Sequence, residues 1–143
     1  MFHYRKKHIA YGTYNKKDEK NNVTCSLCET IQPESIVEET ETMRVIKNRV
    51  PYDVFDNLPS TGEHFMIVPK RHVVLIADFT DEEKLDQMSI IARYEKEGFN
   101  IYARSNTNIR RSQRHQHTHL IKLQRKLPHY IIAIDKPYLL LEG

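Results

Sequence analysis

Several features that would place a protein in a specialised class are scarce or missing from this sequence. No apolar run approaches the roughly 20 residues that a membrane-spanning helix needs. There is no internal repeat and no low-complexity segment, which excludes solenoid and compositionally biased chains. The net charge of +3 is too small by itself to indicate a nucleic-acid-binding protein. We therefore expect no membrane partner and an ordinary globular chain.

Length and composition predict a single folded domain. With 143 residues, 39% hydrophobic and 29% charged, the chain can bury a core and has the balance of a soluble protein. Segment 1–17 is basic but lacks the apolar core of a secretory signal, so we expect a cytoplasmic protein. Residues 1–24 are polar and contain scattered Gly and Asn, which predicts a poorly ordered N-terminal arm. The folded domain is expected at 25–143.

The pattern of apolar residues predicts an α+β fold in which a mostly antiparallel sheet is packed with one long helix. Residues 50–63 contain two prolines and a glycine, and we expect a loop there. Pro69 is expected to end the strand that begins at His64. Short runs of apolar and β-branched residues predict the strands, at 35–40, 42–48, 64–69, 99–103, 115–123 and 129–135.

The long helix has clear start and stop signals. Thr80 followed by Glu83 fits a capping box, in which each residue satisfies a backbone donor of the first turn. Gly98 is a natural C-terminal stop. Apolar residues follow the cap at the spacing of one helical face, at Leu85, Met88, Ile91 and Ala92.

The two cysteines form one C-x-x-C pair, Cys25 and Cys28, for which three interpretations remain open. A structural disulfide is uncommon in a cytosolic chain. A redox pair usually lies beside a βαβ pattern, which this sequence does not show. The third interpretation is half of a zinc site, which requires two further ligands, and histidines are the obvious source.

Three histidines stand at alternate positions in RHQHTHLIK: His115, His117 and His119. In a strand they share one face, with about 6.5–7 Å between neighbours, whereas on a helix the middle one points away. A row of imidazoles can bind metal, bind phosphate or transfer protons. The spacing therefore predicts an extended segment with a chemical role, and places Gln116 and Thr118 on the opposite face.

Three motifs in order resemble the histidine triad family of nucleotide hydrolases and transferases. HQHTHLI is similar to the His-x-His-x-His motif with its apolar continuation, and EHFMIVPKRHV (63–73) is similar to the family's strand ending in Pro-Lys-x-His. CSLC (25–28) matches the C-x-x-C of the zinc-binding members. The resemblance covers roughly residues 25–123 and implies a histidine-triad-like fold.

The resemblance implies a structural zinc site and an enzyme active site. The zinc ligands would be Cys25, Cys28, His72 and His115, a closed tetrahedral set. His117 would attack the α-phosphate of a nucleoside phosphoramidate, dinucleoside polyphosphate or nucleotide sugar and form a nucleotidyl-histidine. Other matched positions would contact the substrate: His119 at the phosphate, and Asn48, His64, Ser112 and Gln113 around it. The family is commonly dimeric, which implies a homodimer.

The sequence departs from the family around the triad. The usual Gly-Gln is replaced by Ser112-Gln113-Arg114, preceded by further arginines, which suggests a more anionic substrate. Gln116 and Thr118 replace apolar residues, so we expect their sheet face to be more exposed than usual. One alternative is therefore a nucleotide- or nucleic-acid-binding module with little catalysis, although a nucleic-acid partner is not favoured. The other alternative is a transition-metal site built from the histidines alone.

Overall fold

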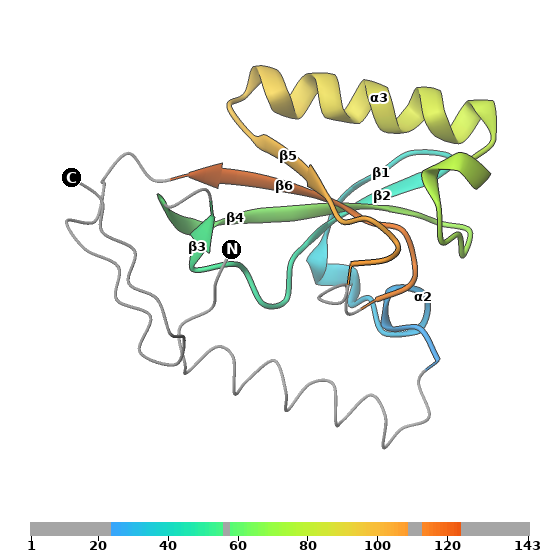
Figure 1. Ribbon diagram of the computed structural model, residues 1–143, viewed down its shortest axis with the longest axis horizontal. Helices are drawn as coiled ribbons and strands as arrows, with labels where there is room; N and C mark the ends of the chain where they lie inside the picture. Colours follow the sequence, from blue (N-terminus) through green and yellow to red (C-terminus); the bar gives the residue numbers. More distant parts are fainter. Residues whose placement is uncertain (1–23, 56–57, 109–112, 124–143) are drawn as a thin grey trace.

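The computed structural model describes residues 24–55, 58–108 and 113–123, and these form an antiparallel sheet with one main helix (Figure 1). The strand order is β1-β2-β4-β6-β5, and every adjacent pair is antiparallel. A short strand β3 pairs with the start of β4. The strands are β1 Ile36–Glu39, β2 Met43–Lys47, β3 Val54–Phe55, β4 Leu58–Pro69, β5 Asn100–Ala103 and β6 Thr118–Leu123. The predicted α+β class is confirmed.

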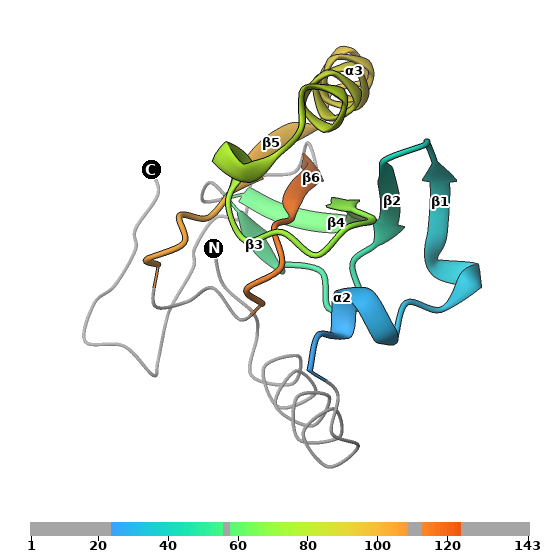
Figure 2. The same cartoon turned by 90° about the vertical axis from the view of Figure 1, so that its right-hand side faces the viewer.

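The two faces of the sheet are covered by different elements (Figure 2). Helix α3, Asp81–Lys96, packs on one face, and the short helix α2, Ser26–Glu29, lies on the other. Two 3-10 turns, Pro33–Ser35 and Ile76–Asp78, complete the secondary structure of the described residues. In the described part of the chain no helix combines the length and apolarity needed to span a membrane.

Each face has its own apolar core. The core beneath α3 comprises Met43, Val45, Ile67, Val73, Phe79, Ile90, Tyr94, Phe99 and Leu120. The core beneath α2 is smaller and comprises Cys25, Leu27, Ile46, Met66 and Val68. Strands β2 and β4 contribute alternate residues to both cores, as expected for strands buried on both faces.

The predicted ends of α3 are confirmed. The Thr80 side chain accepts a hydrogen bond from the Glu83 N–H, and the Glu83 carboxylate accepts one from the Thr80 N–H, which is a complete capping box. Gly98 has φ 87°, the left-handed conformation that glycine adopts at low cost after a helix.

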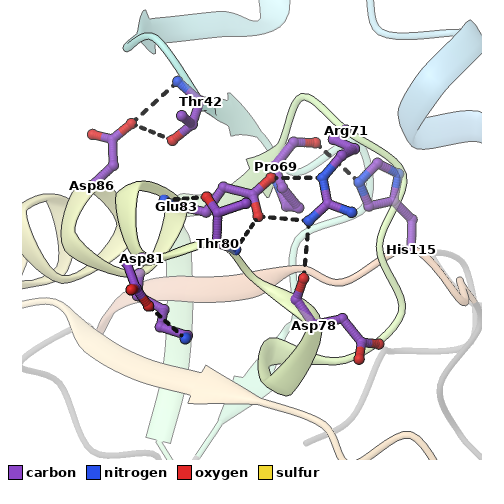
Figure 3. Close-up of polar contacts among 10 residues, drawn as sticks. Thr42, Pro69, Arg71, Asp78, Thr80, Asp81, Glu83, Asp86 and His115 are labelled. Carbon is purple, nitrogen blue, oxygen red and sulfur yellow. Dashed lines mark hydrogen bonds and ion pairs between the residues drawn. The ribbon is translucent and has the colours of Figure 1, made fainter.

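The face of α3 that packs on the sheet differs from the one predicted from its apolar residues. Leu85 and Met88 are 71% and 59% exposed, and the buried residues are Glu83, Gln87, Ile90 and Tyr94. Polar anchors set this rotation. Arg71 holds Glu83 through two hydrogen bonds, and Asp86 binds the β1–β2 turn (Figure 3). Ile91, also in the predicted stripe, is partly buried against the core.

Two predicted strand boundaries are wrong. Residues 50–63 were expected to be a loop, but β3 and the first part of β4 lie there, with Pro59 near the start of β4 opposite Val54. Proline is tolerated near the beginning of a strand. The pairing of β4 with β6 also has a register shift, between Ser60 and His64. The triad strand begins at Thr118 rather than at residue 115. The predicted strand at 129–135 lies outside the described residues.

Candidate functional site

His64 and His119 meet on the α2 face of the sheet. His64 lies on β4 and His119 on β6, in neighbouring register positions, since Met66 pairs with His119 and His64 pairs with Ile121. Their side chains are 1% and 4% exposed, and His64 Nε2 lies 2.9 Å from His119 Nδ1. The sheet pairing therefore brings together two predicted site residues that are far apart in the sequence.

His117 lies just before β6 with a defined orientation. Its Nδ1 is 2.8 Å from the backbone carbonyl of His115, and a carbonyl can only accept, so Nδ1 carries the proton. In the neutral form of the ring, the lone pair is therefore on Nε2. The ring stands nearly perpendicular to that of His119, at 86° with centroids 5.0 Å apart. This is the protonation state that a nucleophilic imidazole requires.

A second cluster lies beside the triad and consists of Cys25, Cys28, His72 and His115. Their ligand atoms all lie within 4.8 Å of one another. His115 Nδ1 is 3.5 Å from Cys25 Sγ and 3.2 Å from Cys28 Sγ, and His72 Nδ1 is 3.3 Å from Cys28 Sγ. When a cysteine sulfur and a histidine nitrogen bind one tetrahedral zinc ion at typical bond lengths, the two ligand atoms are about 3.5 Å apart. The cluster joins the start of α2, the loop after β4 and the segment that leads to His117.

The chemistry of the cluster fits a divalent metal such as zinc. His115 Nε2 donates to the Pro69 carbonyl at 3.0 Å (Figure 3). This leaves the Nδ1 lone pair facing the two sulfurs. Without a metal, burial raises the pKa of Cys28 to about 11, assisted by neighbouring Cys25. Burial, with the charge of His72 second, lowers the pKa of His115 to about 4. A bound cation would stabilise the thiolate forms of the two cysteines by supplying a nearby positive charge.

The remaining predicted substrate residues are only partly assembled. Asn48 lies against His64, with Nδ2 at 3.1 Å from Nε2 and 3.4 Å from Nδ1, and its Oδ1 accepts from the Val50 N–H. Gln113 is half-buried at the start of the last described range. Ser112 lies outside the described residues.

The expectation that Gln116 and Thr118 are unusually exposed is wrong. They are 3% and 2% exposed. The Gln116 backbone N–H donates to the Val73 carbonyl, so this segment is tied to the loop after β4 instead of continuing the sheet ladder. Thr118 lies two residues before Leu120 and thus on the face that α3 covers. The core beneath α3 therefore accounts for the burial of Thr118, and the contact with the loop after β4 for that of Gln116.

Two residues of the site had no signal in the sequence: Tyr52, which contacts His119, and Arg104, which contacts Tyr52. The Tyr52 backbone N–H donates to His64 Nδ1 at 3.1 Å, and its hydroxyl lies 3.2 Å from His119 Nε2. Arg104 Nη2 donates to the same hydroxyl at 3.0 Å. Tyr52 lies in the segment that was expected to be a loop, and Arg104 is one of several arginines that precede the triad in the sequence. Neither had a spacing signal that could have revealed its partner.

The surroundings of His119 keep it neutral. Burial is the main cause that lowers its pKa well below the usual value, followed by the charges of His117, His64 and Arg104. With the ring neutral, each nitrogen has a single role, either donor or acceptor. Within the described residues, the site thus combines the His117 ring, whose Nδ1 is held by a carbonyl, the neutral His119 and the Arg104 guanidinium.

Comparisons with known proteins support the fold. No protein-family model matches the sequence, and no curated protein does either. The chain is similar to a Zn-bound histidine triad family protein from Mycobacterium smegmatis, with 24% identity and a TM-score of 0.53, over 73% of this chain and 80% of that one.

Two further solved structures have the same TM-score. A HIT family hydrolase from Clostridium thermocellum has 20% identity and a TM-score of 0.53, over 73% of this chain and 95% of that one. A histidine triad nucleotide-binding protein from Candida albicans has 17% identity and a TM-score of 0.53, over 78% of this chain and 88% of that one. The predicted histidine triad resemblance is therefore confirmed at the level of the fold.

Proposed function

We propose that this protein is a nucleotide-processing hydrolase or transferase that uses His117 as a nucleophile. The substrate class is a nucleoside phosphoramidate, a dinucleoside polyphosphate or a nucleotide sugar. The observation that carries the proposal is the hydrogen bond from His117 Nδ1 to the His115 carbonyl, which presents the Nε2 lone pair of a neutral ring. The similar solved structures include one named as a hydrolase and one named as nucleotide-binding.

The reaction consists of two displacements at the α-phosphorus. In the first, His117 Nε2 forms a bond to phosphorus while the bond to the leaving group breaks. The ring then carries positive charge, and the Nδ1–H···O=C bond to His115 stabilises it. In the second, water or another acceptor attacks phosphorus and the P–N bond breaks, which restores the neutral imidazole.

Neighbouring groups position the nucleotide and balance its charge. His119, His64 and Asn48 line the region beside the nucleophile, and we assign Ser112 and Gln113 to the phosphate and leaving-group side. Arg104, which reaches the Tyr52 hydroxyl, adds a positive charge within the same cluster. Phosphoryl transfer depends chiefly on such positioning and charge stabilisation.

A structural zinc ion is the second part of the proposal, held by Cys25, Cys28, His72 and His115. When bound, the ion supplies a four-ligand cross-link with no open position for substrate. Its effect on catalysis is to fix the His115 backbone, because the His115 carbonyl orients His117. Among similar structures, the Mycobacterium smegmatis protein is named as Zn-bound.

The test is turnover by the full chain with zinc, using adenosine phosphoramidate, diadenosine tetraphosphate, a nucleotide sugar and adenylated DNA. We expect His117→Ala to reduce turnover by at least about 1,000-fold, since the covalent route is lost. Mass spectrometry of quenched wild type should find a nucleotidyl adduct on the peptide that contains His117. Unchanged turnover in a folded, zinc-loaded His117→Ala protein would contradict the proposal.

A binding module without catalysis is the second candidate. It is favoured by one observation: both ring nitrogens of His119 are already engaged within the protein, by His64 and by Tyr52. This candidate predicts micromolar nucleotide binding with no product from any substrate of the panel. Nucleic-acid binding would also weaken steeply with salt, because Arg and Lys contacts release counterions.

A further inference from the structure

The hydrogen bonds around His119 form a closed cycle that begins and ends at Tyr52. The Tyr52 N–H reaches His64 Nδ1 at 3.1 Å, His64 Nε2 reaches His119 Nδ1 at 2.9 Å, and His119 Nε2 reaches the Tyr52 hydroxyl at 3.2 Å. The Tyr52 ring also packs on both imidazoles, with centroids 4.6 and 5.2 Å away. Tyr52 is 7% exposed, so the cycle is largely shielded from water.

The backbone N–H of Tyr52 determines the direction of every bond in this cycle. A peptide N–H can only donate, so His64 Nδ1 accepts and the proton of neutral His64 is on Nε2. His64 therefore donates to His119 Nδ1, and neutral His119 carries its proton on Nε2. The Asn48 amide does not alter this assignment, because it lies almost equally far from both ring nitrogens of His64 and is aligned with neither.

His119 is consequently a poor proton donor to a leaving group. To release its Nε2 proton it would have to become an imidazolate or receive a proton from His64 at the same moment. His64 cannot replace that proton, because its Nδ1 faces a peptide N–H, which does not release one. The burial and the nearby Arg104 charge also disfavour a doubly protonated His119.

The Tyr52 hydroxyl is chemically better suited to that role. It accepts hydrogen bonds from His119 Nε2–H and from Arg104 Nη2 at 3.0 Å, so its own O–H points away from both donors. If the proton leaves, the phenolate keeps both donors and faces a guanidinium whose central carbon lies 5.7 Å from the ring centroid. Hydrogen bonds that are retained by a charged form stabilise that form.

We propose that Tyr52 is the general acid that protonates the leaving group, with Arg104 and His119 as its positioning residues. This inference rests on the proposed function. As His117 Nε2 bonds to phosphorus and the bond to the leaving group breaks, the Tyr52 proton passes to the leaving atom. In the second displacement the phenolate takes a proton from the attacking water, the P–N bond breaks and the enzyme returns to its starting state.

The test compares two nucleoside monophosphate derivatives that differ in their leaving group. An adenosine 5′-phosphoramidate loses an amine, which must be protonated as it leaves. Adenosine 5′-(4-nitrophenyl) phosphate loses nitrophenolate, which is stable as an anion. We expect Tyr52→Phe to lower kcat/KM for the phosphoramidate by about 100-fold or more, the usual effect of losing a general acid, and for the nitrophenyl ester by less than about tenfold.

Tyr52→Phe retains the ring packing and the backbone N–H that directs the histidine cycle. The ratio of the two rates is also independent of the fraction of folded enzyme. Arg104→Gln should shift the ratio in the same direction, and Arg104→Lys should restore part of it. Equal losses on both substrates in Tyr52→Phe, or no loss on either, would overturn the proposal. His117→Ala reports separately on the proposed function, because it should abolish both reactions.

Discussion

At the scale of single residues, Asp86 fixes helix α3 to the β1–β2 turn. One carboxylate oxygen accepts from the Thr42 hydroxyl at 2.6 Å and from the Thr42 N–H at 3.3 Å (Figure 3). The same oxygen accepts from the Thr40 hydroxyl at 2.6 Å. Burial opposes the charge, but the hydrogen bonds from Thr40 and Thr42 together outweigh it and lower the pKa of Asp86. The charged form is therefore part of the folded structure.

We predict that Asp86→Ala lowers the free energy of unfolding by about 1–3 kcal/mol, the usual range for losing hydrogen bonds to a charged group. The matched control is Glu82→Ala, an exposed acidic residue on the same helix, which should cost less than about 0.5 kcal/mol. Urea denaturation monitored by circular dichroism measures both. Equal changes in the free energy of unfolding for the two variants would show that the contact between Asp86 and the β1–β2 turn does not contribute to stability.

His119 gives the protein a predictable response to pH. Its pKa is lowered in the folded state, so below about pH 6.5 the unfolded chain binds a proton at this residue that the folded protein does not. Stability should therefore fall on acidification from pH 7 to 5.5, by up to about 1.4 kcal/mol per pH unit for this group. The urea midpoint of zinc-loaded protein tests this, and His119→Gln should have a shallower slope. An identical slope in the variant would contradict it.

At the scale of elements, the orientation of α3 shows how tertiary contacts override a local pattern. The apolar stripe at Leu85 and Met88 faces solvent, and Ile90, 1% exposed, faces the sheet. Arg71 and the Thr80 cap hold Glu83, and this fixes the helix rotation near its first turn. Ion pairing of Arg93 with Glu38 at 2.7 Å adds a contact near its end.

We predict that Ile90→Ala lowers the free energy of unfolding by about 2–5 kcal/mol, because it leaves a cavity under the helix. Leu85→Ala, on the exposed face, should change it by less than about 0.5 kcal/mol. Denaturant titration of the two variants beside wild type checks the assignment. A large loss of stability in Leu85→Ala with none in Ile90→Ala would mean that the helix packs on the sheet with its Leu85 face instead.

At the scale of the whole molecule, the Cys/His cluster joins segments that are far apart in the chain. Cys25 and His115 are separated by 90 positions, and the strands β1 to β5 lie between them. A metal that binds only the folded state stabilises it by mass action. The homodimer and the cytoplasmic location stay predictions at this scale.

We predict that Cys28→Ser or a strong chelator removes zinc and lowers the free energy of unfolding. The loss should be about 4 kcal/mol for zinc supplied at a thousand times its dissociation constant. Metal analysis and thermal denaturation provide the two readouts. Zinc that remains bound to Cys28→Ser with wild-type affinity would instead favour a site formed by the histidines alone.

Local signals in the sequence determined the elements whose causes are local. The Thr80–Glu83 capping box and Gly98 act within one turn of the chain, so the ends of α3 were predictable. The Cys25/Cys28 pair and the alternate histidines had motif spacing, and their resemblance to one family predicted the fold. Pro69 ended its strand as expected, because a proline cannot donate to a ladder.

Only the tertiary structure decided features that depend on distant partners. The rotation of α3 follows from contacts with Arg71 and with the β1–β2 turn. The burial of Gln116 and Thr118 follows from the Val73 contact and the helix above β6. Tyr52 joined the site because β4 and β6 pair in a register that places His64 beside His119. Such partners have no fixed spacing in the sequence, so no local pattern encodes them.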